Sequence, residues 1–434
     1  MSLVIRKRGR SCAAATFAAL CLSGMIGPAH ADTVTDWNAT AAALPMAAAP
    51  VLARVMATMH GAMVDAIGAI EPRYEPYRFR VEAPAGASED AAVAAAAHDV
   101  LVALAPSQKG ALDAALAQSL ARVHDERAKA DGILVGERVA ERFLAWRAKD
   151  NFDAKAEDRP GTRAGAWQRT PPGYEPGVLP QFGGVTPFLI ESVDPDVAEG
   201  RPRLSSPQFA RDLDEIRRLG GRRSTGRSAE QTAVAVFWTG NEILQLNAVA
   251  RAVSQARKLS MPENARLFAL VHMAAADALI VSFRIKYREN AWRPITAIRA
   301  GSGGAAADPD WESLLVTPPH PEFPSAHCMT TGAVAQVLRE LFGSDEVKVG
   351  YVYPPGLGMV RDYTSLTQLE REVEDARVYA GIHFRSTDRF STELGRRVGA
   401  EAVARYPRLA PAPAPETSLR APKARLTCTE CASG

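Results

Sequence analysis

The residues best suited to chemistry lie where a proline-rich stretch ends and a helix is expected to begin, at Ser325, Ala326 and His327. Prolines at positions 318, 319, 321 and 324 fix φ and remove backbone donors, which predicts a rigid, extended loop up to Ser325. A helical pattern follows over residues 330–342. The first N–H groups of a helix have no partner within it and attract anions. A hydroxyl, free N–H groups and an imidazole would therefore converge here, which predicts a site for a tetrahedral oxyanion.

Two further clusters supply the positive charge that a buried oxyanion needs. Lys286 and Arg293 are seven residues apart, which is two helical turns, so both could point the same way. Arg377 and His383 are six residues apart, which aligns them less well on a helix and predicts a bend between them. Three cations together with the donors near Ser325 would stabilise two or more negative charges.

Taken in order, these three pieces resemble a known pattern: Lys-x6-Arg-Pro, then Pro-Ser-Gly-His, then Arg-x5-His. It is the pattern of the vanadium-dependent haloperoxidases and of the acid phosphatases in the type 2 phosphatidic acid phosphatase superfamily. In this chain it spans residues 286–383. Each piece alone is a weak signal, whereas three in order with matching spacing are a strong one. The flanking residues 277–294 and 381–385 are more similar to the haloperoxidase branch.

The resemblance implies vanadate as the cofactor, with phosphate able to occupy the same site. His383 would coordinate vanadium, which makes it the one metal ligand. His327 would hydrogen-bond the opposite apical oxygen and handle protons. Lys286 would polarise the bound peroxide, supplied as hydrogen peroxide, so that a halide attacks it and hypohalous acid is released. The resemblance thus implies catalytic roles for His327, Lys286 and His383, and implies that the anion is held by Lys286, Arg293, Ser325, Ala326, His327, Arg377 and His383.

Two other functions would use the same residues. In a secreted acid phosphatase, His383 would attack phosphorus to form a phosphohistidine, and His327 would protonate the leaving alcohol. A non-catalytic phosphate- or vanadate-binding protein would keep the cations and tolerate the loss of His327. The length of the chain and its secretion signal favour the haloperoxidase, which would use hydrogen peroxide and a halide in place of a phosphate ester.

Three positions depart from the family pattern. Ala326 replaces a glycine, which adds a methyl group to the anion pocket and restricts φ. Ala376 stands where a serine usually precedes the arginine. Thr387 stands where an aspartate usually follows the histidine by four residues, and the nearest acid, Asp388, would be turned by about 100° on a helix. Asp388 remains a candidate to support His383, but this shift weakens the nucleophilic, phosphatase role of His383 most.

Two more residues are candidates for roles around the site. His320 lies where the family's chloroperoxidases carry phenylalanine and its bromoperoxidases carry histidine, which predicts bromide or iodide over chloride. A histidine that makes only local hydrogen bonds in the loop explains it equally well. Asp277 lies among alanines in an amphipathic helical pattern over residues 263–283. If buried it needs a partner, for which we expect Arg293 or Arg377; the alternative is a solvated face.

Residues 1–31 read as a secretory signal, with a basic start, an apolar run over residues 12–26 and an Ala-x-Ala cleavage site at residues 29–31. Cleavage would remove four of the 51 basic residues and none of the 49 acidic ones, so the net charge would change from +2 to −2. A near-neutral chain gives no reason to expect nucleic acid as a partner. Because no later apolar run is expected to reach the length that spans a bilayer, we expect no membrane insertion after cleavage and a periplasmic or secreted protein.

Cleavage would leave three of the five cysteines. Cys428 and Cys431 lie in a Pro/Ala-rich tail, where a local disulfide is favoured over a redox or metal site in an oxidising compartment. Cys328 is expected to be a small buried apolar residue.

The rest of the sequence predicts an all-α protein of packed helical bundles of the vanadium haloperoxidase and acid phosphatase type, with few or no strands, because no stretch alternates apolar and polar residues. Helices are expected over residues 89–104, over 108–148 with an interruption near Gly132, and over 227–257, and Ser206 is expected to cap another. The sequence leaves the oligomeric state open. It divides into a signal peptide (1–31), an N-terminal helical region (32–155), an irregular Pro/Gly-rich segment (156–205), a C-terminal helical region with the oxyanion site (206–408) and a flexible tail (409–434).

Overall fold

A computed structural model describes residues 32–46, 48–71, 75–191, 200–352 and 359–407. The expected signal peptide, Cys428 and Cys431 and the tail from residue 409 lie outside these residues. The helices are α1 (Thr33–Ala42), α2 (Ala49–Ile70), α3 (Glu89–Leu104), α4 (Lys109–Leu120), α5 (Glu126–Arg147), α6 (Pro207–Leu219), α7 (Ala229–Phe237), α8 (Glu242–Arg257), α9 (Met261–Glu289), α10 (Pro294–Ala300), α11 (Ala326–Phe342), α12 (Leu366–Tyr379) and α13 (Arg385–Arg405). The strands are β1 (Glu346–Val352) and β2 (Val360–Ser365), and short 3-10 turns cover Pro106–Gln108 and Phe182–Gly184.

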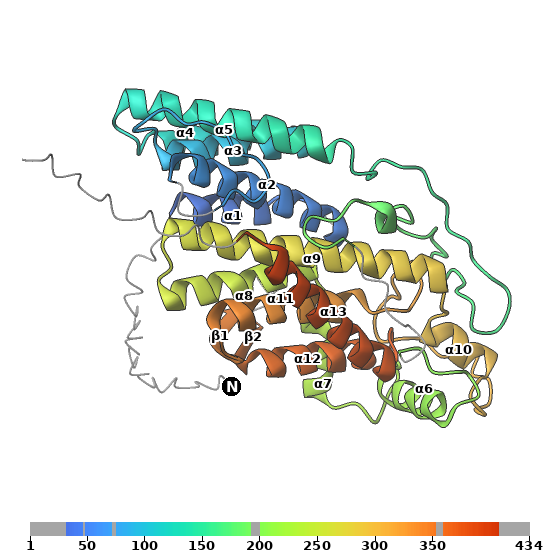
Figure 1. The fold of residues 1–434 in the computed structure, drawn as a ribbon. Coiled ribbons are helices and arrows are strands. Elements are labelled where there is room, and N and C mark those ends of the chain that lie inside the picture. Colours follow the sequence, from blue (N-terminus) through green and yellow to red (C-terminus); the bar gives the residue numbers. More distant parts are fainter. Residues whose placement is uncertain (1–31, 47, 72–74, 192–199, 353–358, 408–434) are drawn as a thin grey trace, which may run out of the picture.

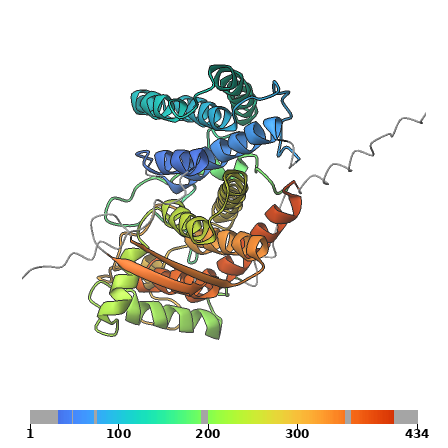
Figure 2. The same cartoon turned by 90° about the vertical axis from the view of Figure 1, so that its left-hand side faces the viewer.

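The helices form two layers that share α9 (Figure 1). On one side α9 packs against α2, which in turn packs against α3 and α5. On the other side α9 packs against α11 and α13, and α12 lies against α11. Figure 2 shows the same layers from the end, with the blue-to-cyan helices of residues 33–147 above and the green-to-red elements below. The predicted all-α bundle fold is confirmed, and the two antiparallel strands form the one sheet in the described part of the chain.

Helix α9 is the central element because it is buried on nearly every side. Its start is fixed by a capping box, in which Glu263 reaches back to Ser260, and by Pro262 in the first turn. It ends at Glu289, and the C-cap residue Asn290 has a left-handed backbone (φ 48°). By length and composition α9 could cross a bilayer, contrary to our expectation that no later run is long enough. However, its most apolar window is 94% buried inside the protein, and core helices pass the same test.

Several helices end where the sequence did not predict an end. The expected helix over 227–257 is interrupted at Trp238–Asn241, where Asn241 caps α8 by accepting a hydrogen bond from the N–H of Ile243. The expected interruption near Gly132 is wrong: the break falls at residues 121–125, and Gly132 lies inside α5. A Cβ atom at Gly132 would approach Ser88 O to 2.4 Å, so the glycine allows close helix packing. The predicted cap at Ser206 is confirmed.

The irregular segment is anchored to α9 by Asp277. Its carboxylate accepts backbone N–H bonds from Phe188 (2.6 Å), Leu189 (2.8 Å) and Ile190 (3.1 Å). The prediction that Asp277 pairs with Arg293 or Arg377 is therefore wrong, and so is the solvated alternative, because the residue is fully buried. The three peptide donors take the place of an arginine partner, although burial still raises the pKa of Asp277 to about 6.

A second buried polar cluster joins the two layers. The rings of His60 on α2 and His272 on α9 stack with centroids 5.1 Å apart, and both residues are at most 1% exposed. Asn38 donates to His60 Nε2 (3.0 Å), and His272 Nε2 donates to Asn247 Oδ1 (3.0 Å). Burial lowers the pKa of His272 to about 3 and lowers the pKa of His60 well below its usual value, so both imidazoles are neutral.

Candidate functional site

Three buried cations meet beside the proline-rich loop. Lys286, at the end of α9, donates to the carbonyls of Pro321 (3.0 Å), Glu322 (3.1 Å) and Pro324. The spacing of two helical turns suggested that Lys286 and Arg293 lie on one helix. They do not, because α9 ends at Glu289. The chain turns at Asn290 and brings Arg293, the N-cap residue of α10, back to the same place.

Arg293 holds the loop and the third motif together. Its Nε donates to His320 O (3.0 Å), and one NH1 hydrogen goes to Ile382 O (2.8 Å). Its other contacts are with Pro318 O (3.3 Å) and with the rings of His320 and His383 (3.1 and 3.2 Å). Arg377, near the end of α12, donates to Trp238 O (2.7 Å) in the unexpected break between α7 and α8. Backbone carbonyls therefore hold all three cations.

No ion pair with a carboxylate is formed by Lys286, Arg293 or Arg377 within the described ranges, although each is at most 3% exposed. Burial lowers the pKa of all three, and brings that of Arg293 to about 9. Three buried positive charges without a directly bound anion are costly for the protein, and a multiply charged oxyanion would offset that cost. The donor set thus fits vanadate or phosphate.

Unused donors at the start of α11 support the same conclusion. The Ser325 hydroxyl and Nε of Arg377 are both buried, and neither has a hydrogen-bond partner of good geometry in the part of the chain that the structure describes. Ser325 is the N-cap residue of α11, and no side chain caps the helix, which leaves its first N–H groups for an anion. Ala326 fits as the first residue of this helix, where it is 7% exposed.

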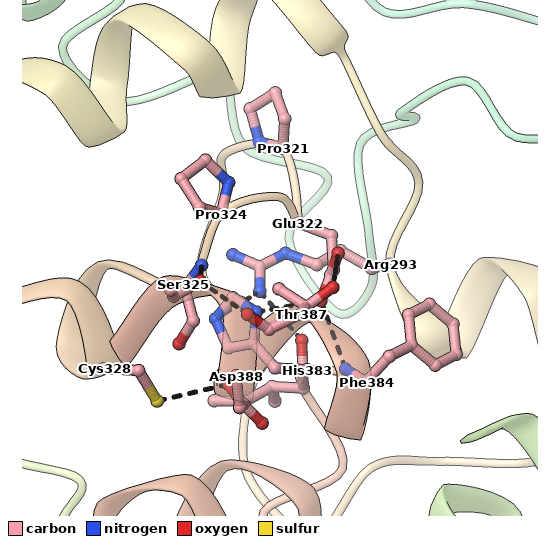
Figure 3. Close-up of polar contacts among 12 residues, drawn as sticks. Arg293, Pro321, Glu322, Pro324, Ser325, Cys328, His383, Phe384, Thr387 and Asp388 are labelled. Atoms are coloured by element: carbon pink, nitrogen blue, oxygen red, sulfur yellow. Dashed lines mark hydrogen bonds and ion pairs between the residues drawn. The ribbon is translucent and has the colours of Figure 1, made fainter. Parts of the chain in front are cut away.

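His383 lies between α12 and α13, in the bend predicted from its spacing to Arg377. Helix α12 ends at Tyr379, and Gly381 then takes a positive φ of 80°. His383 Nε2 lies 3.2 Å from NH1 of Arg293, and Nδ1 lies 3.1 Å from Oε1 of Glu322 (Figure 3). Burial and the charge of Arg293 lower the pKa of His383 well below its usual value, so the ring is neutral.

Glu322 was not singled out from the sequence, although it belongs to the site. It is the one acidic residue in the stretch 317–328, and it immediately precedes the Phe-Pro-Ser of the motif. Its carboxylate also accepts from Thr387, the residue that replaces the expected aspartate. The sequence signal that could have led to Glu322 is the absence of the expected aspartate at position 387, which leaves room for another carboxylate beside His383.

His327 projects from the first turn of α11 towards the break between α7 and α8. Its Nε2 donates to Gly240 O (3.3 Å) and lies 3.6 Å from Oε2 of Glu242, a second buried acid that the sequence analysis missed. Burial raises the pKa of Glu242 and lowers that of His327, and the positive charge of Arg377 lowers the pKa of His327 further. A neutral imidazole beside a buried carboxyl group is suited to moving protons.

His320 lies at the edge of the site and is half buried. Its Nδ1 is 3.1 Å from both NH2 of Arg293 and Pro321 O, and its ring packs on Phe283 with centroids 5.6 Å apart. The irregular segment reaches this loop too, because the N–H of Val178 donates to Pro319 O (2.9 Å).

Asp388 is buried but turned away from His383. Its Oδ1 accepts from the thiol of Cys328 (3.3 Å), and burial raises the pKa of the Asp388 carboxyl well above its usual value. The predicted rotation of the acid away from His383 is what the structure shows. Cys328 is fully buried, as expected. The structure thus brings together the residues predicted to hold the anion: Lys286, Arg293, Ser325, Ala326, His327, Arg377 and His383. Asp277 lies elsewhere.

Comparison with known proteins agrees with this arrangement. Residues 266–411 match the family described as the vanadium chloroperoxidase (VCPO) second helical-bundle domain. The vanadium chloroperoxidase of Curvularia inaequalis is 30% identical over 145 residues, which cover 27% of this chain and 24% of that protein. The match thus spans about a quarter of the curated relative. The resemblance predicted from the three motifs is confirmed.

Solved structures extend the likeness to most of the chain. The first bacterial vanadium-dependent iodoperoxidase has a TM-score of 0.76 and 23% identity, covering 88% of this chain and 97% of that one. A holo-type bacterial vanadium-dependent chloroperoxidase has a TM-score of 0.65 and 18% identity, covering 84% and 94%. At these identities the likeness shows the fold, which is the helical fold of the vanadium haloperoxidases.

Proposed function

We propose that this chain is a vanadate-dependent haloperoxidase that oxidises a halide with hydrogen peroxide to hypohalous acid, with bromide or iodide favoured over chloride. The observation that carries the proposal is the set of three buried cations, none of which forms an ion pair with a carboxylate in the described residues, beside the buried hydroxyl of Ser325, which has no hydrogen-bond partner of good geometry there. The named relatives, a chloroperoxidase and an iodoperoxidase, support the reaction class. The sequence of residues 1–31 supports a periplasmic or secreted location, which the mass of the exported chain would test.

The chemistry of each side chain indicates its role in the proposed reaction. Bound vanadate would activate hydrogen peroxide towards the halide. Lys286, Arg293 and Arg377 bind and neutralise the oxyanion, and the Ser325 hydroxyl donates to it. His383 presents the unprotonated Nε2 of a neutral ring, the form in which imidazole serves as a metal ligand. His327 holds a proton at Nε2 and can exchange it, with Glu242 3.6 Å away to stabilise the charged ring.

Acid phosphatase activity is the second candidate, and one observation favours it. The shift of the acid from position 387 to 388 weakened the nucleophilic role of His383 in the sequence analysis. Glu322 nevertheless lies 3.1 Å from His383 Nδ1, so the ring still has a carboxylate opposite the nitrogen that would attack phosphorus.

The decisive experiment compares both reactions in the same purified chain. We expect peroxide-dependent bromination of a dye after reconstitution with orthovanadate, faster with bromide or iodide than with chloride, and little activity before it. Hydrolysis of a nitrophenyl phosphate without bromination would establish the phosphatase instead. The variant His327→Ala tests a purely binding role: an enzyme loses turnover, whereas a binding protein keeps full vanadate affinity and the wild type shows no turnover of either substrate.

A further inference from the structure

The carboxylate of Glu322 is engaged on both oxygens by groups at the start of α13. Oε1 accepts from the N–H of Phe384 and from His383 Nδ1, each at 3.1 Å, and Oε2 accepts from the Thr387 hydroxyl at 3.0 Å (Figure 3). The side chain is 3% exposed, as is that of His383. Its backbone is held as well, because its N–H donates to Ala291 O at 2.9 Å and its carbonyl accepts from Lys286.

Both neighbours of the His383 ring select the same tautomer. Burial raises the pKa of Glu322 to about 7, but its Oε1 already accepts from the N–H of Phe384 and so serves as an acceptor, which places the ring proton of His383 on Nδ1. A guanidinium only donates, so contact with Arg293 requires a lone pair on Nε2. That lone pair therefore faces the three cations, which is the orientation that an imidazole ligand or nucleophile needs.

We propose that Glu322 is the positioning residue of His383, and that it replaces the aspartate that the resembling family carries four residues after this histidine. The acid has moved from the start of α13 to the proline-rich loop. Thr387 now occupies the former position, and its hydroxyl fixes the second oxygen of the relocated carboxylate. The inference rests on the proposed anion site, because positioning Nε2 matters for function only if an oxyanion binds there.

The other nearby acid is excluded by its contacts. Asp388 is one residue beyond Thr387 on α13, and its Oδ1 accepts from the Cys328 thiol at 3.3 Å on another side of the site. The negative charge of Glu322 also offsets part of the positive charge of Lys286 and Arg293, but its carboxylate is directed to His383, Phe384 and Thr387 and forms no ion pair with either cation in the described structure. The Glu322 carboxylate is therefore placed to orient the ring.

The test uses the full-length protein and needs no turnover. In the vanadate-free protein with ¹⁵N-labelled histidine, the His383 resonances, assigned by their loss in His383→Gln, should show a proton on Nδ1. We expect Glu322→Ala to mix the two tautomers and to weaken orthovanadate binding in calorimetry by about 10- to 100-fold. Adding Thr387→Asp to this variant should restore the acid at the family position, recover the tautomer and return the affinity to within about fivefold of wild type.

Two further variants make the result unambiguous. Asp388→Asn should leave the His383 tautomer as in wild type, whereas a change there with none in Glu322→Ala would overturn the proposal. If Glu322→Ala does not fold, Glu322→Gln keeps the shape and removes the charge, and wild-type affinity together with a wild-type tautomer in that variant would overturn it as well. A wild-type protein that binds vanadate but oxidises no halide would refute the proposed function and leave the positioning role intact.

Discussion

Replacing Arg293 by methionine should weaken anion binding without destabilising the vanadate-free protein. Burial lowers the pKa of Arg293 from the ordinary arginine range to about 9, which corresponds to a cost of about 5 kcal/mol at 1.36 kcal/mol per pH unit. Because the pKa is lower in the folded state, this cost is complete below about pH 9 and disappears only above the ordinary pKa of an arginine. At pH 7 methionine removes the whole of it.

The substitution also removes donors from the carbonyls of Pro318, His320 and Ile382. At about 1 kcal/mol for each of three carbonyls, that loss is roughly 3 kcal/mol. We therefore expect the free energy of unfolding of the vanadate-free variant to equal that of the wild type or to exceed it by up to about 2 kcal/mol. If the burial of the charge cost little, loss of the three carbonyl contacts would instead destabilise the variant by roughly 3 kcal/mol.

In the presence of vanadate, by contrast, the Arg293→Met variant should be stabilised less than the wild type. At a free concentration 100 times Kd, the anion stabilises the wild type by about 2.7 kcal/mol. Loss of one charge-assisted contact costs about 1.5–3 kcal/mol, so the stabilisation of the variant should fall to roughly 0.3–1.3 kcal/mol.

Urea unfolding at pH 7 with and without orthovanadate measures both effects. Arg127→Met on α5 is the matched control, because its side chain is 90% exposed. A variant of Arg293 that loses more than about 3 kcal/mol yet keeps the vanadate response would refute the reasoning.

Three other predictions concern separate parts of the molecule. Asp277→Ala leaves three buried N–H groups without an acceptor, so the free energy of unfolding should fall by at least about 3 kcal/mol and hydrogen exchange at residues 188–190 should accelerate; a loss under about 1 kcal/mol would contradict this. The depressed pKa of His272, about 3 in the folded state, means that stability falls as the pH drops below about 6.5. Between pH 7 and 4.5, His272→Gln should lose about 3 kcal/mol less than the wild type in urea titrations, and equal losses would be inconsistent with a buried neutral imidazole. His320→Phe should raise the ratio of chloride to bromide oxidation by roughly fivefold to tenfold, since it removes a polar contact worth about 1 kcal/mol; an unchanged ratio would show that His320 has only a local role.

Sequence signals predicted the features that depend on neighbouring residues. The cap at Ser206 and the helix start after Ser325 follow from capping and proline chemistry, which act within one turn. The bend between Arg377 and His383 followed from a spacing that fits a helix poorly. These preferences are local, so the rest of the fold does not change them.

Features that depend on contacts between residues far apart in the sequence were missed. The break at Trp238–Asn241 carries a local signal that the helix prediction overlooked, Gly240 followed by the N-cap residue Asn241, but its role becomes clear only when Arg377 binds Trp238 O. The partner of Asp277 was mistaken for the same reason. Backbone amides 87–89 positions away carry no sequence signal, whereas an arginine in a motif is conspicuous. Glu322 belongs to this class too, because its function depends on Thr387, 65 positions further along.

The site is built from the ends of helices, which explains how buried cations can be held in place before an anion binds. Lys286 is near the end of α9, Arg377 is near the end of α12, and Ser325 precedes α11. Loops and helix ends carry peptide groups that no helix uses, so carbonyls there can hold each cation in the absence of the ligand. These carbonyls are neutral and bind less strongly than an oxyanion would. An arriving anion would therefore find its donors already positioned and would need to displace only weak contacts, which is the preorganisation that tight binding of a small, highly charged ligand requires.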